Sequence, residues 1–467
     1  MKTKCSLFLD RKQAKLKKNI ALNFEGGNIS SDGGLPLLSL VESKYSLFDR
    51  VAAAFSDFRD PDRITHSVRD LIAQRILAIA LGYEDLNDHD SLSKDSLLAC
   101  VVGKQDLSAR QDQINLLASS STLNRLELTS QKDFDQSHRY HKIRCNSEKL
   151  EKLFVDLFIE SYESAPDEII LDLDHTDNPI HGKQEGRFFH GYYDCYCYLP
   201  LYVFCGEQLL VAKLRTSDGN PMRGVLEEMK RVIRHIRKHW PNTKIILRGD
   251  SGFCREQLMS WSEDQENVSY VFGLARNNRL LDMIYEDLEL AEIDYILTEK
   301  AQRRFVELEY KTRESWSCSR RVVAKAEHLE KGSNPRFIVT NLPKEEWPGK
   351  ELYEETYCAR GEMENKIKEQ QLYLFADRTS AGKFEANQLR LWFSSLAYVL
   401  FSGLRRMGLK GTELEKARSD TIRLKLLKLG AQVKVTVRRL WLKLSSSYPL
   451  KELFRKVWKN LTEELHH

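Results

Sequence analysis

The nine residues "IILRGDSGF" at positions 245–253 join a continuous apolar run to a carboxylate with a glycine close on either side. Residues 245–247 predict a buried strand, because uninterrupted apolar runs are typical of short parallel strands covered by helices. Glycine and aspartate are ordinary turn residues, so one interpretation of Asp250 is a simple turn. The alternative is a functional carboxylate at a strand tip, which requires partner carboxylates elsewhere in the chain.

The segment "EIILDLD" at 168–174 supplies two candidate partners. Its apolar, β-rich run predicts a strand in which Asp172 and Asp174 share one face, opposite the neighbouring leucines. Carboxylates in an apolar strand are costly unless they are paired or bind a cation. We expect this first strand to neighbour the fourth, which ends at Asp250. Asp174 and Asp250 would then repel each other until a cation binds.

A third carboxylate lies in "YCARGEMENKIKEQQ", residues 357–371. On an ideal helix, with about 100° per residue, one narrow stripe holds Tyr357, Arg360, Glu364 and Lys368. Ordinary ion pairing on a solvated helix face is an alternative explanation of this stripe. Gly361 favours a functional site, because a glycine inside a helix costs about 1 kcal/mol relative to alanine and permits a close approach.

The order of the predicted elements indicates an α/β fold. Predicted strands cover 168–174, one bent strand through 187–205, 209–212, 244–250 and 270–275. One predicted helix begins at Asn220-Pro221, and a second, short helix covers 255–262. Strands in a run followed by strand, helix and strand are typical of an RNase H-like core. Hairpins at 304–310, 321–326 and 337–340 indicate a mainly β insertion, and helix is expected from about residue 352 to the end.

The first 150 residues are predicted to be mostly helical, with one helix capped by Ser67 and ended by Gly82, and another starting near Ser147. The chain of 467 residues has a net charge of +4. Residues 1–24 carry seven Lys/Arg against one acid, and residues 401–467 carry sixteen against six. Basic ends favour a polyanionic partner, although solvated helix faces would also explain them.

The nine cysteines include no CxxC pair, which favours free thiols in a reducing cytoplasm. The first residues lack the apolar core of a signal peptide. The longest uncharged apolar stretch, 391–404, is too short to span a bilayer. We therefore expect a soluble intracellular protein with no membrane partner. No Cys/His group has zinc-finger spacing, so His175 and His181 are interpreted as polar neighbours of the site rather than zinc ligands.

Several motifs together resemble those of DDE transposases from bacterial insertion sequences, in particular the group with a Tyr-Arg-Glu-Lys signature. The similar segments are Asp174-His175-Thr176, "RGDSGF" at 248–253, Tyr357-x2-Arg360-x3-Glu364, "GYEDLNDHDSL" at 82–92 and the stretch 422–449. The resemblance thus covers nearly the whole chain. The signature's final lysine falls at Gln371, and Lys368, one turn after Glu364, is the candidate to replace it.

The resemblance implies five regions. They are a helical DNA-end-binding domain at 1–150, the first part of an RNase H-like core at 151–280, a β-rich insertion at 281–350, the second part of the core with the glutamate helix at 351–404, and a basic helical region at 405–467.

It also implies a catalytic and metal-binding set of Asp174, Asp250 and Glu364. Oxygen ligands of this kind select Mg²⁺, with Mn²⁺ as a substitute, and two such ions support phosphoryl transfer. On this interpretation the glycines beside Asp250 give the ions and a DNA phosphate access. The implied reaction is cleavage at terminal inverted repeats by water, then attack of the 3′-OH on target DNA. The implied assembly is a homodimer acting in the bacterial cytoplasm at the nucleoid.

Tyr357, Arg360 and Lys368 are suited to the DNA backbone. Trp316 and Trp347 are candidates to stack on an unpaired base, with packing as the alternative. Asp172 would replace Asp174 if the latter proved dispensable. Two other functions are compatible with parts of the pattern: a structure-selective endonuclease of the same fold, which cuts without joining, and a DNA-binding regulator, which would not need the acids.

Overall fold

The computed structural model describes residues 7–9, 17–104, 107, 116–128 and 140–465. The chain forms two compact units. The first comprises Met1–Phe48, Pro61–Asn124 and Gly403–His467, and the second comprises Asp49–Asp60 and Arg125–Ser402. Residues from both ends of the chain therefore build one unit. Most of the basic N-terminal arm, including Lys2, Lys4, Arg11, Lys12 and Lys15, lies outside the described residues.

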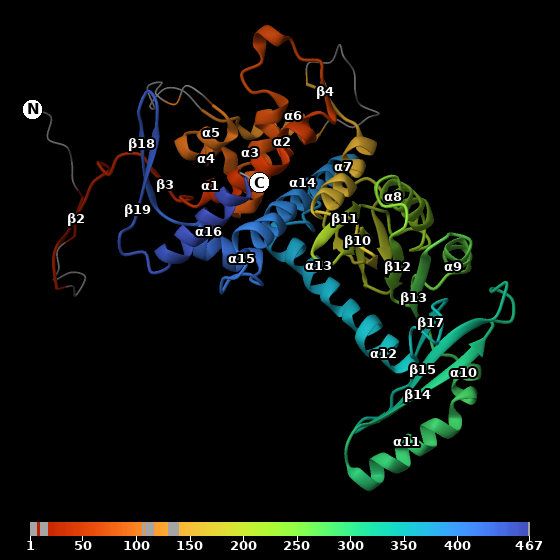
Figure 1. The fold of residues 1–467 in the computed structure, drawn as a ribbon. Helices are drawn as coiled ribbons and strands as arrows, with labels where there is room; N and C mark the ends of the chain where they lie inside the picture. The colour runs from red at the N-terminus through yellow and green to blue at the C-terminus, as the bar shows by residue number, and fades with distance from the viewer. Residues whose placement is uncertain (1–6, 10–16, 105–106, 108–115, 129–139, 466–467) are drawn as a thin grey trace, which may run out of the picture. The chain divides into compact units, whose positions relative to one another are not determined.

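The second unit is built on one large sheet (Figure 1). Its first five strands in the chain are β6 (Glu168–His175), β10 (Leu201–Cys205), β11 (Gln208–Lys213), β12 (Lys244–Gly249) and β13 (Val268–Leu274). They are arranged β11-β10-β6-β12-β13. Strand β10 is antiparallel to both of its neighbours, β11 and β6, and β12 is parallel to both β6 and β13. This is the RNase H-like α/β core that the sequence predicts.

Strand alternation divides this core into two faces. Leu171 and Leu173 on β6 join the apolar cluster of α7 (Ser147–Glu160) and α8 (Val225–His239). The residues between and after them on β6 point the other way, toward α13 (Gly361–Leu374). Figure 1 shows α13 on one side of these strands, with α8 and α9 (Glu256–Glu263) on the other. The acids of β6 therefore lie on the α13 face.

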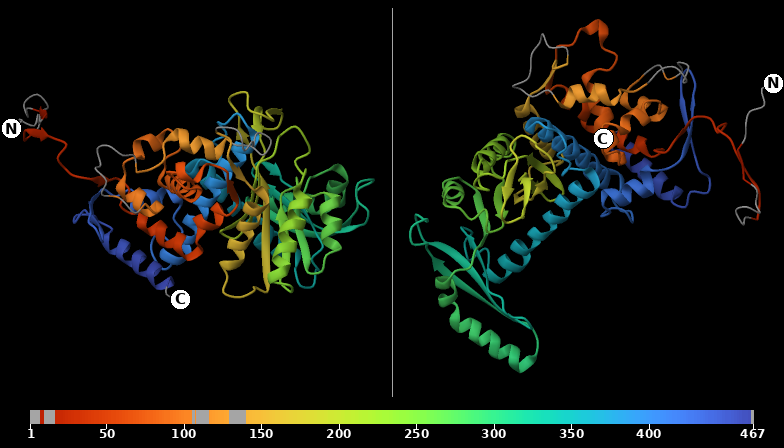
Figure 2. Two further views of the ribbon diagram at one scale, coloured as in Figure 1. Left: turned by 90° about the horizontal axis from the view of Figure 1, so that it is seen from above. Right: turned by 180° about the vertical axis from the view of Figure 1, so that it is seen from behind.

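The predicted insertion is present, and it continues the core sheet. Strand β17 (Arg336–Thr340) pairs antiparallel with β13, and β15 (Arg320–Leu329) and β14 (Gln302–Tyr310) follow it. The short β16 (Gly332–Ser333) pairs with β15. Two helices were not predicted: α10 (Asn278–Met283) and α11 (Tyr285–Thr298). Helix α11 lies along the β14–β15 hairpin (Figure 2).

Two local predictions within the core are wrong. The expected bent strand through 187–205 is three strands, because β8 (Phe188–His190) and β9 (Cys195–Tyr198) form a small sheet with β7 (Asn178–Pro179), separate from β10. Asp194, in the left-handed region at φ 52°, turns the chain between β8 and β9. The helix expected at Asn220 begins only at Val225, because the Asn220 side chain accepts a hydrogen bond from the Met222 amide and forms a turn.

A continuous helical segment leads to the face of the sheet that carries the acids of β6. It begins with α12 (Gly349–Glu351), passes through a π-helical turn at Leu352–Tyr357 and a 3₁₀ turn at Cys358–Arg360, and continues as α13. Helix α14 (Phe384–Gly403) follows, and its Tyr398 ring packs against Phe204 of β10. The remaining strands of this unit, β4 (Phe55–Asp57) and β5 (Ile143–Cys145), pair with each other.

The first unit is mainly helical. Helix α3 (Val68–Leu81) begins at Ser67, whose side chain forms a reciprocal capping pair with Asp70, and ends at Gly82 in the left-handed conformation, as predicted. Its other elements are β1 (Leu7–Leu9), β2 (Ile20–Leu22), β3 (Ile29–Ser30), α1 (Leu35–Tyr45), α4 (Asp88–Leu92), α5 (Ser96–Val102), α15 (Ser419–Ile422) and α16 (Lys451–Glu464), with α2 (Leu47–Ala52) and α6 (Ser120–Glu127) at its borders.

The expectation of helix to the end of the chain is wrong. Strands β18 (Ala431–Val435) and β19 (Leu440–Leu444) form a hairpin, and β18 also pairs with β3. Alternating burial along β18 explains the difference, because a two-residue repeat suits a strand with one covered face. Across the described ranges, no helix combines the length and apolarity needed to cross a bilayer.

Candidate active site

Two aspartates meet at the carboxyl ends of neighbouring parallel strands. Leu173 of β6 is in register with Gly249 of β12, so the next residues, Asp174 and Asp250, follow at the same edge of the sheet. The amide of His175 donates to Asp174 Oδ1 at 2.9 Å. The amide of Gly252 donates to Asp250 Oδ1 at 2.8 Å. The backbone thus orients one oxygen of each carboxylate.

The glycines around Asp250 make room for the protein's own groups. A Cβ on Gly249 would lie 2.9 Å from the Phe253 ring, and one on Gly252 would lie 2.9 Å from Asp250 Oδ1. Contacts under 3.0 Å require a shift of the neighbouring atoms. Small residues here are therefore needed to seat Phe253 and to let an amide reach Asp250. The expectation that these glycines give ions and a DNA phosphate access to the carboxylate stays a prediction.

The electrostatics at Asp174 fit a cation. Burial, together with the negative charges of Asp250 and Glu364, raises the pKa of Asp174 to about 6 against the lowering effects of Arg360 and the His175 amide. Three carboxylates close enough to influence one another are stabilised by a positive ion. Their oxygen atoms are the ligands that hard divalent ions prefer. The residues present therefore fit the divalent metal ions that this kind of site uses.

Arg360, rather than Glu364, is the residue of the helical stripe that pairs with Asp174. Arg360 Nη1 lies 3.6 Å from Asp174 Oδ2. Glu364 instead pairs with Lys368, with Lys368 Nζ 3.5 Å from Glu364 Oε2 and both side chains more than half exposed. The metal-binding set implied by the resemblance instead requires Glu364 to lie beside the two aspartates. The helix is regular from Gly361 onward, so Glu364 lies about one turn farther along the helix axis than Arg360.

Tyr357 reaches across to the strand beside Asp250. A Cβ on Gly273 of β13 would lie 2.5 Å from the Tyr357 hydroxyl, so the absence of a side chain there admits the tyrosine. Burial, opposed by Arg360 and reinforced by Asp250, raises the pKa of Tyr357. The phenol therefore stays protonated near neutral pH and can donate a hydrogen bond.

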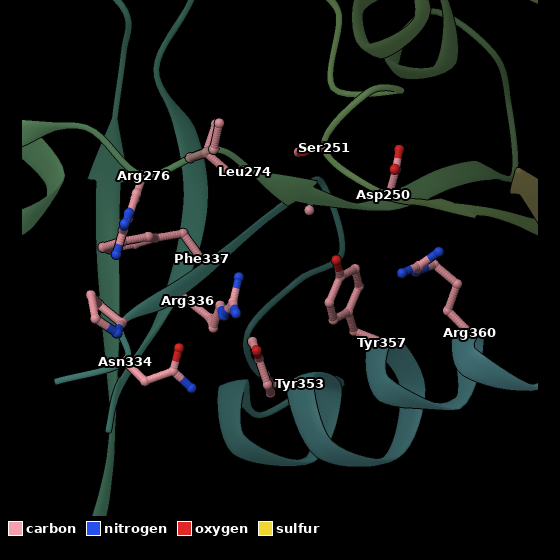
Figure 3. Close-up of a pocket in the computed structure, with 13 residues that line it drawn as sticks. Asp250, Ser251, Leu274, Arg276, Asn334, Arg336, Phe337, Tyr353, Tyr357 and Arg360 are labelled. Carbon is pink, nitrogen blue, oxygen red and sulfur yellow. The ribbon is translucent and has the colours of Figure 1, made fainter. Parts of the chain in front are cut away.

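A cavity of about 520 Å³ opens beside Asp250. Figure 3 shows Tyr357 and Arg360 pointing from the helix toward the Asp250 strand, with Arg276 and Arg336 farther along the cavity. Among the thirteen residues that line it, three are arginines and one is an acid. An electropositive hollow beside a carboxylate site suits a nucleic acid phosphate.

Sequence reasoning missed Arg276 and Arg336. Arg276 lies two residues beyond β13, at the same strand ends as the aspartates. The rule that ligands bind beyond the carboxyl ends of parallel strands could have identified it. Arg336 begins β17 and is brought in by the sheet extension, for which the sequence contains no local signal.

Asp172 does not belong to the acid site. Its two carboxylate oxygens accept hydrogen bonds from Arg248 Nε at 2.5 Å and Nη2 at 2.8 Å. Both residues are buried, and Arg248 also donates to the backbone carbonyl of Thr356. Asp172 is thus an ion-paired structural residue that ties β6 and β12 to the segment before α13, and it is a poor substitute for Asp174.

The remaining candidates are dispersed. Trp316 is 5% exposed, with its ring 5.6 Å from Tyr310 and under the Arg320 guanidinium. This favours packing and leaves no face for stacking a base. Trp347 is half-buried, packs against a small apolar cluster, and accepts a hydrogen bond from Arg321 at its carbonyl.

His175 lies beside the acids, where burial lowers its pKa, while His181 is exposed. Gln371, at the position of the signature lysine, donates to Asp177 O at 3.0 Å and Asn178 Oδ1 at 3.1 Å. It therefore orders the loop after β6, and Lys368 remains the basic residue near Glu364.

These features agree with the comparison to known families. Residues 12–465 match the family "Transposase DDE domain group 1". Because the match covers nearly the whole chain, the protein belongs to this family of DDE transposase domains. No curated protein matches the sequence. A piggyBac transposase synaptic complex with hairpin DNA is similar in structure, with a TM-score of 0.42, 10% identity, and coverage of 93% of this chain and 82% of that chain.

Proposed function

We propose that the protein is the transposase of an insertion sequence. It binds the terminal inverted repeats of its element, cuts the DNA and joins the released 3′-OH ends to target DNA. The observation that carries the proposal is the pair of strand-tip aspartates, Asp174 and Asp250, with Arg360 and Glu364 on the helix facing them. Membership of the DDE transposase family supports the same chemistry.

Asp174, Asp250 and Glu364 would hold two Mg²⁺ ions, or Mn²⁺ in their place. When bound, such ions lower the pKa of water and stabilise charge on the oxygens of an in-line phosphoryl displacement. The protein's own contribution is orientation, since backbone amides fix one oxygen of each aspartate. Glu364 would leave Lys368 for this site, and its exposure allows the change at small cost.

The DNA backbone would cross the cavity beside Asp250. Arg360 and Tyr357 would hold the phosphate nearest the cut, because a guanidinium and a protonated phenol both donate to phosphate oxygens. Arg276 and Arg336 would contact phosphates farther along the strand, and Lys368 would contact DNA from the exposed side of α13. Trp347 is retained as a candidate for contact with an unpaired base.

End recognition is assigned to the first 150 residues, and synapsis to a homodimer acting on cytoplasmic DNA. The first unit also contains Gly403–His467, with its excess of basic residues. We therefore propose that the basic C-terminal region assists the N-terminal region on DNA.

The proposal is tested with the full chain, Mg²⁺, and a plasmid carrying a marker between the DNA segments that flank the gene. Cleavage at both flanks followed by joining to a second plasmid is expected. Cleavage without joining would favour the endonuclease, and specific binding without cleavage would favour the regulator. Asp264→Asn, an exposed acid of the same unit, is the control variant and should behave as the unmodified protein does.

A further inference from the structure

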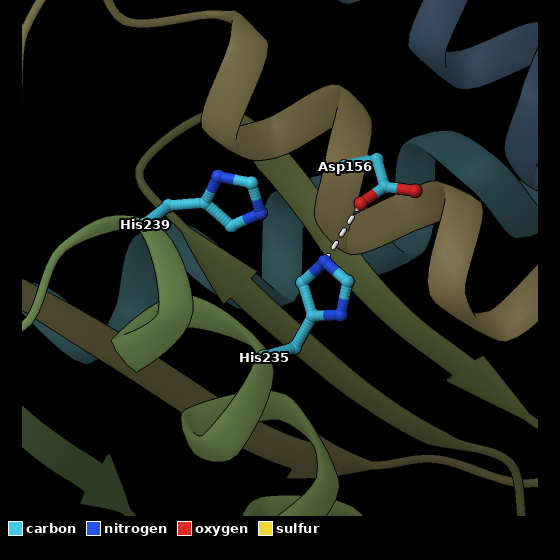
Figure 4. A group of neighbouring side chains, drawn as sticks. All are labelled: Asp156, His235 and His239. Atoms are coloured by element: carbon cyan, nitrogen blue, oxygen red, sulfur yellow. Dashed lines mark hydrogen bonds and ion pairs between the residues drawn. The ribbon is translucent and has the colours of Figure 1, made fainter.

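A second group of metal-ligating side chains lies away from the acids. Asp156 of α7 and His235 and His239 of α8 each offer one ligand atom, and these atoms all lie within 4.8 Å of one another. Figure 4 shows the three side chains converging between the two helices. His235 and His239 are four residues apart and so project from one side of α8.

The cluster is separate from the transposition site. Helices α7 and α8 pack on the face of β6 that carries Leu171 and Leu173. Asp174 is on the opposite face, toward α13, because its position in the strand alternates with those leucines. A cation at the cluster is therefore divided from Asp174 and Asp250 by the sheet itself.

Part of the cluster is already ordered. His235 Nε2 and Asp156 Oδ1 lie 2.6 Å apart, and the His235 side chain is only 11% exposed. His239 is exposed, with its ring centroid 5.7 Å from that of His235. A part-buried pair next to an exposed third ligand leaves the outer side open to water, which would complete the coordination of an ion.

The donor set selects the class of ion. Two imidazole nitrogens and one carboxylate suit zinc and related transition metals, whereas magnesium and calcium require several oxygen ligands. We propose that Asp156, His235 and His239 bind a zinc(II) ion that links α7 to α8.

The alternative explanation is that the Asp156–His235 hydrogen bond by itself holds the two helices together, without any metal. His239 distinguishes the two explanations, because the Asp156–His235 bond does not involve it. Its exposure also means that replacing it should leave the fold intact.

The test is isothermal titration of the full chain with zinc chloride, after removal of metal and in a background of Asp174→Asn and Asp250→Asn to eliminate the acid site. One zinc ion per chain is expected, together with a rise in Tm. Even residues that only support metal ligands contribute about 10–100-fold to affinity. His239→Ala should therefore weaken binding at least about tenfold with an unchanged metal-free Tm, and His328→Ala on β15 should not weaken it.

Zinc affinity in His239→Ala equal to that of the background protein, or no zinc binding by the background protein, would overturn the proposal. A metal-free Tm lowered by Asp156→Asn, in a protein that binds no zinc, would show that the group is a helix–helix hydrogen bond only. Neither outcome bears on transposition, because the cluster and the acids lie on opposite faces of the sheet.

Discussion

Arg360 Nη1 lies 3.6 Å from Asp174 Oδ2, so the arginine that we assign to DNA also partly neutralises a buried acid. The acid has a pKa raised to about 6 by burial, and Arg360 is the largest influence in the opposite direction. In the absence of DNA, the Arg360 guanidinium thus supplies part of the positive charge that the Asp174 carboxylate needs. We expect phosphate and cations to take over this role together, leaving Arg360 free to contact the DNA backbone.

Arg360→Ala should move the acid limb of the pH–rate profile to higher pH. Removal of the positive charge raises the pKa of Asp174 further, and the carboxylate is needed in its ionised form. Single-turnover cleavage measured from pH 5 to 9 checks the shift, with Arg360→Lys as the control that retains the charge. A limb that stays in place, or moves to lower pH, would contradict the electrostatic link.

Asp174→Asn should stabilise the metal-free protein. A carboxyl whose pKa is raised from 3.8 to about 6 is held unfavourably when ionised. The folded protein therefore loses stability as the pH rises from about 4 to about 6. The amide should recover about 2 to 3 kcal/mol at pH 7, since one pKa unit corresponds to about 1.4 kcal/mol. Urea unfolding in EDTA at pH 7 and pH 4 tests this, and the gain should largely vanish at the lower pH.

Asp172→Asn should have the opposite effect on stability. It leaves Arg248 charged and buried without its carboxylate partner, and breaking a buried pair costs about 3–5 kcal/mol. Any fall in cleavage should follow the loss of folded protein. Thermal unfolding and the activity per folded molecule separate these effects. An unchanged Tm combined with abolished cleavage would place Asp172 in the catalytic set.

Replacing glycine by alanine should change the stability of the protein in opposite directions at two positions. Gly361 has open space around its Cβ position and helical backbone angles, so alanine should stabilise the protein by up to about 1 kcal/mol. A Cβ on Gly273 would lie 2.5 Å from the Tyr357 hydroxyl and 2.9 Å from the Ser251 amide. Gly273→Ala should therefore lower the Tm and slow cleavage by displacing Tyr357 and the Asp250 turn. Equal Tm values for the two variants would contradict this account of the glycines.

The sequence predicted the central part of the fold well, because apolar runs and turn residues specify short buried strands locally. The pairing of Asp174 with Asp250 followed from strand order alone. By contrast, the partner of Asp172 depends on Arg248 reaching across from β12. Which residue of the helical stripe pairs with Asp174 depends on how far the helix extends past the strand ends, and no local sequence signal specifies that. Helix α11 was missed because Leu290, Ile293 and Ile296 remain exposed on it, so no single apolar face marks it.

The central claim is that Glu364 completes a divalent-metal site with Asp174 and Asp250. Glu362, two residues earlier on the same helix and also exposed, provides a matched control. The measurement is the single-turnover rate of Mg²⁺-dependent cleavage of flanking DNA by Glu364→Gln and Glu362→Gln. We predict a loss of about 10³-fold or more for Glu364→Gln, because several kcal/mol of charge stabilisation disappears, and a near-normal rate for Glu362→Gln. Near-normal cleavage by Glu364→Gln, or an equal loss in both variants, would contradict the assignment.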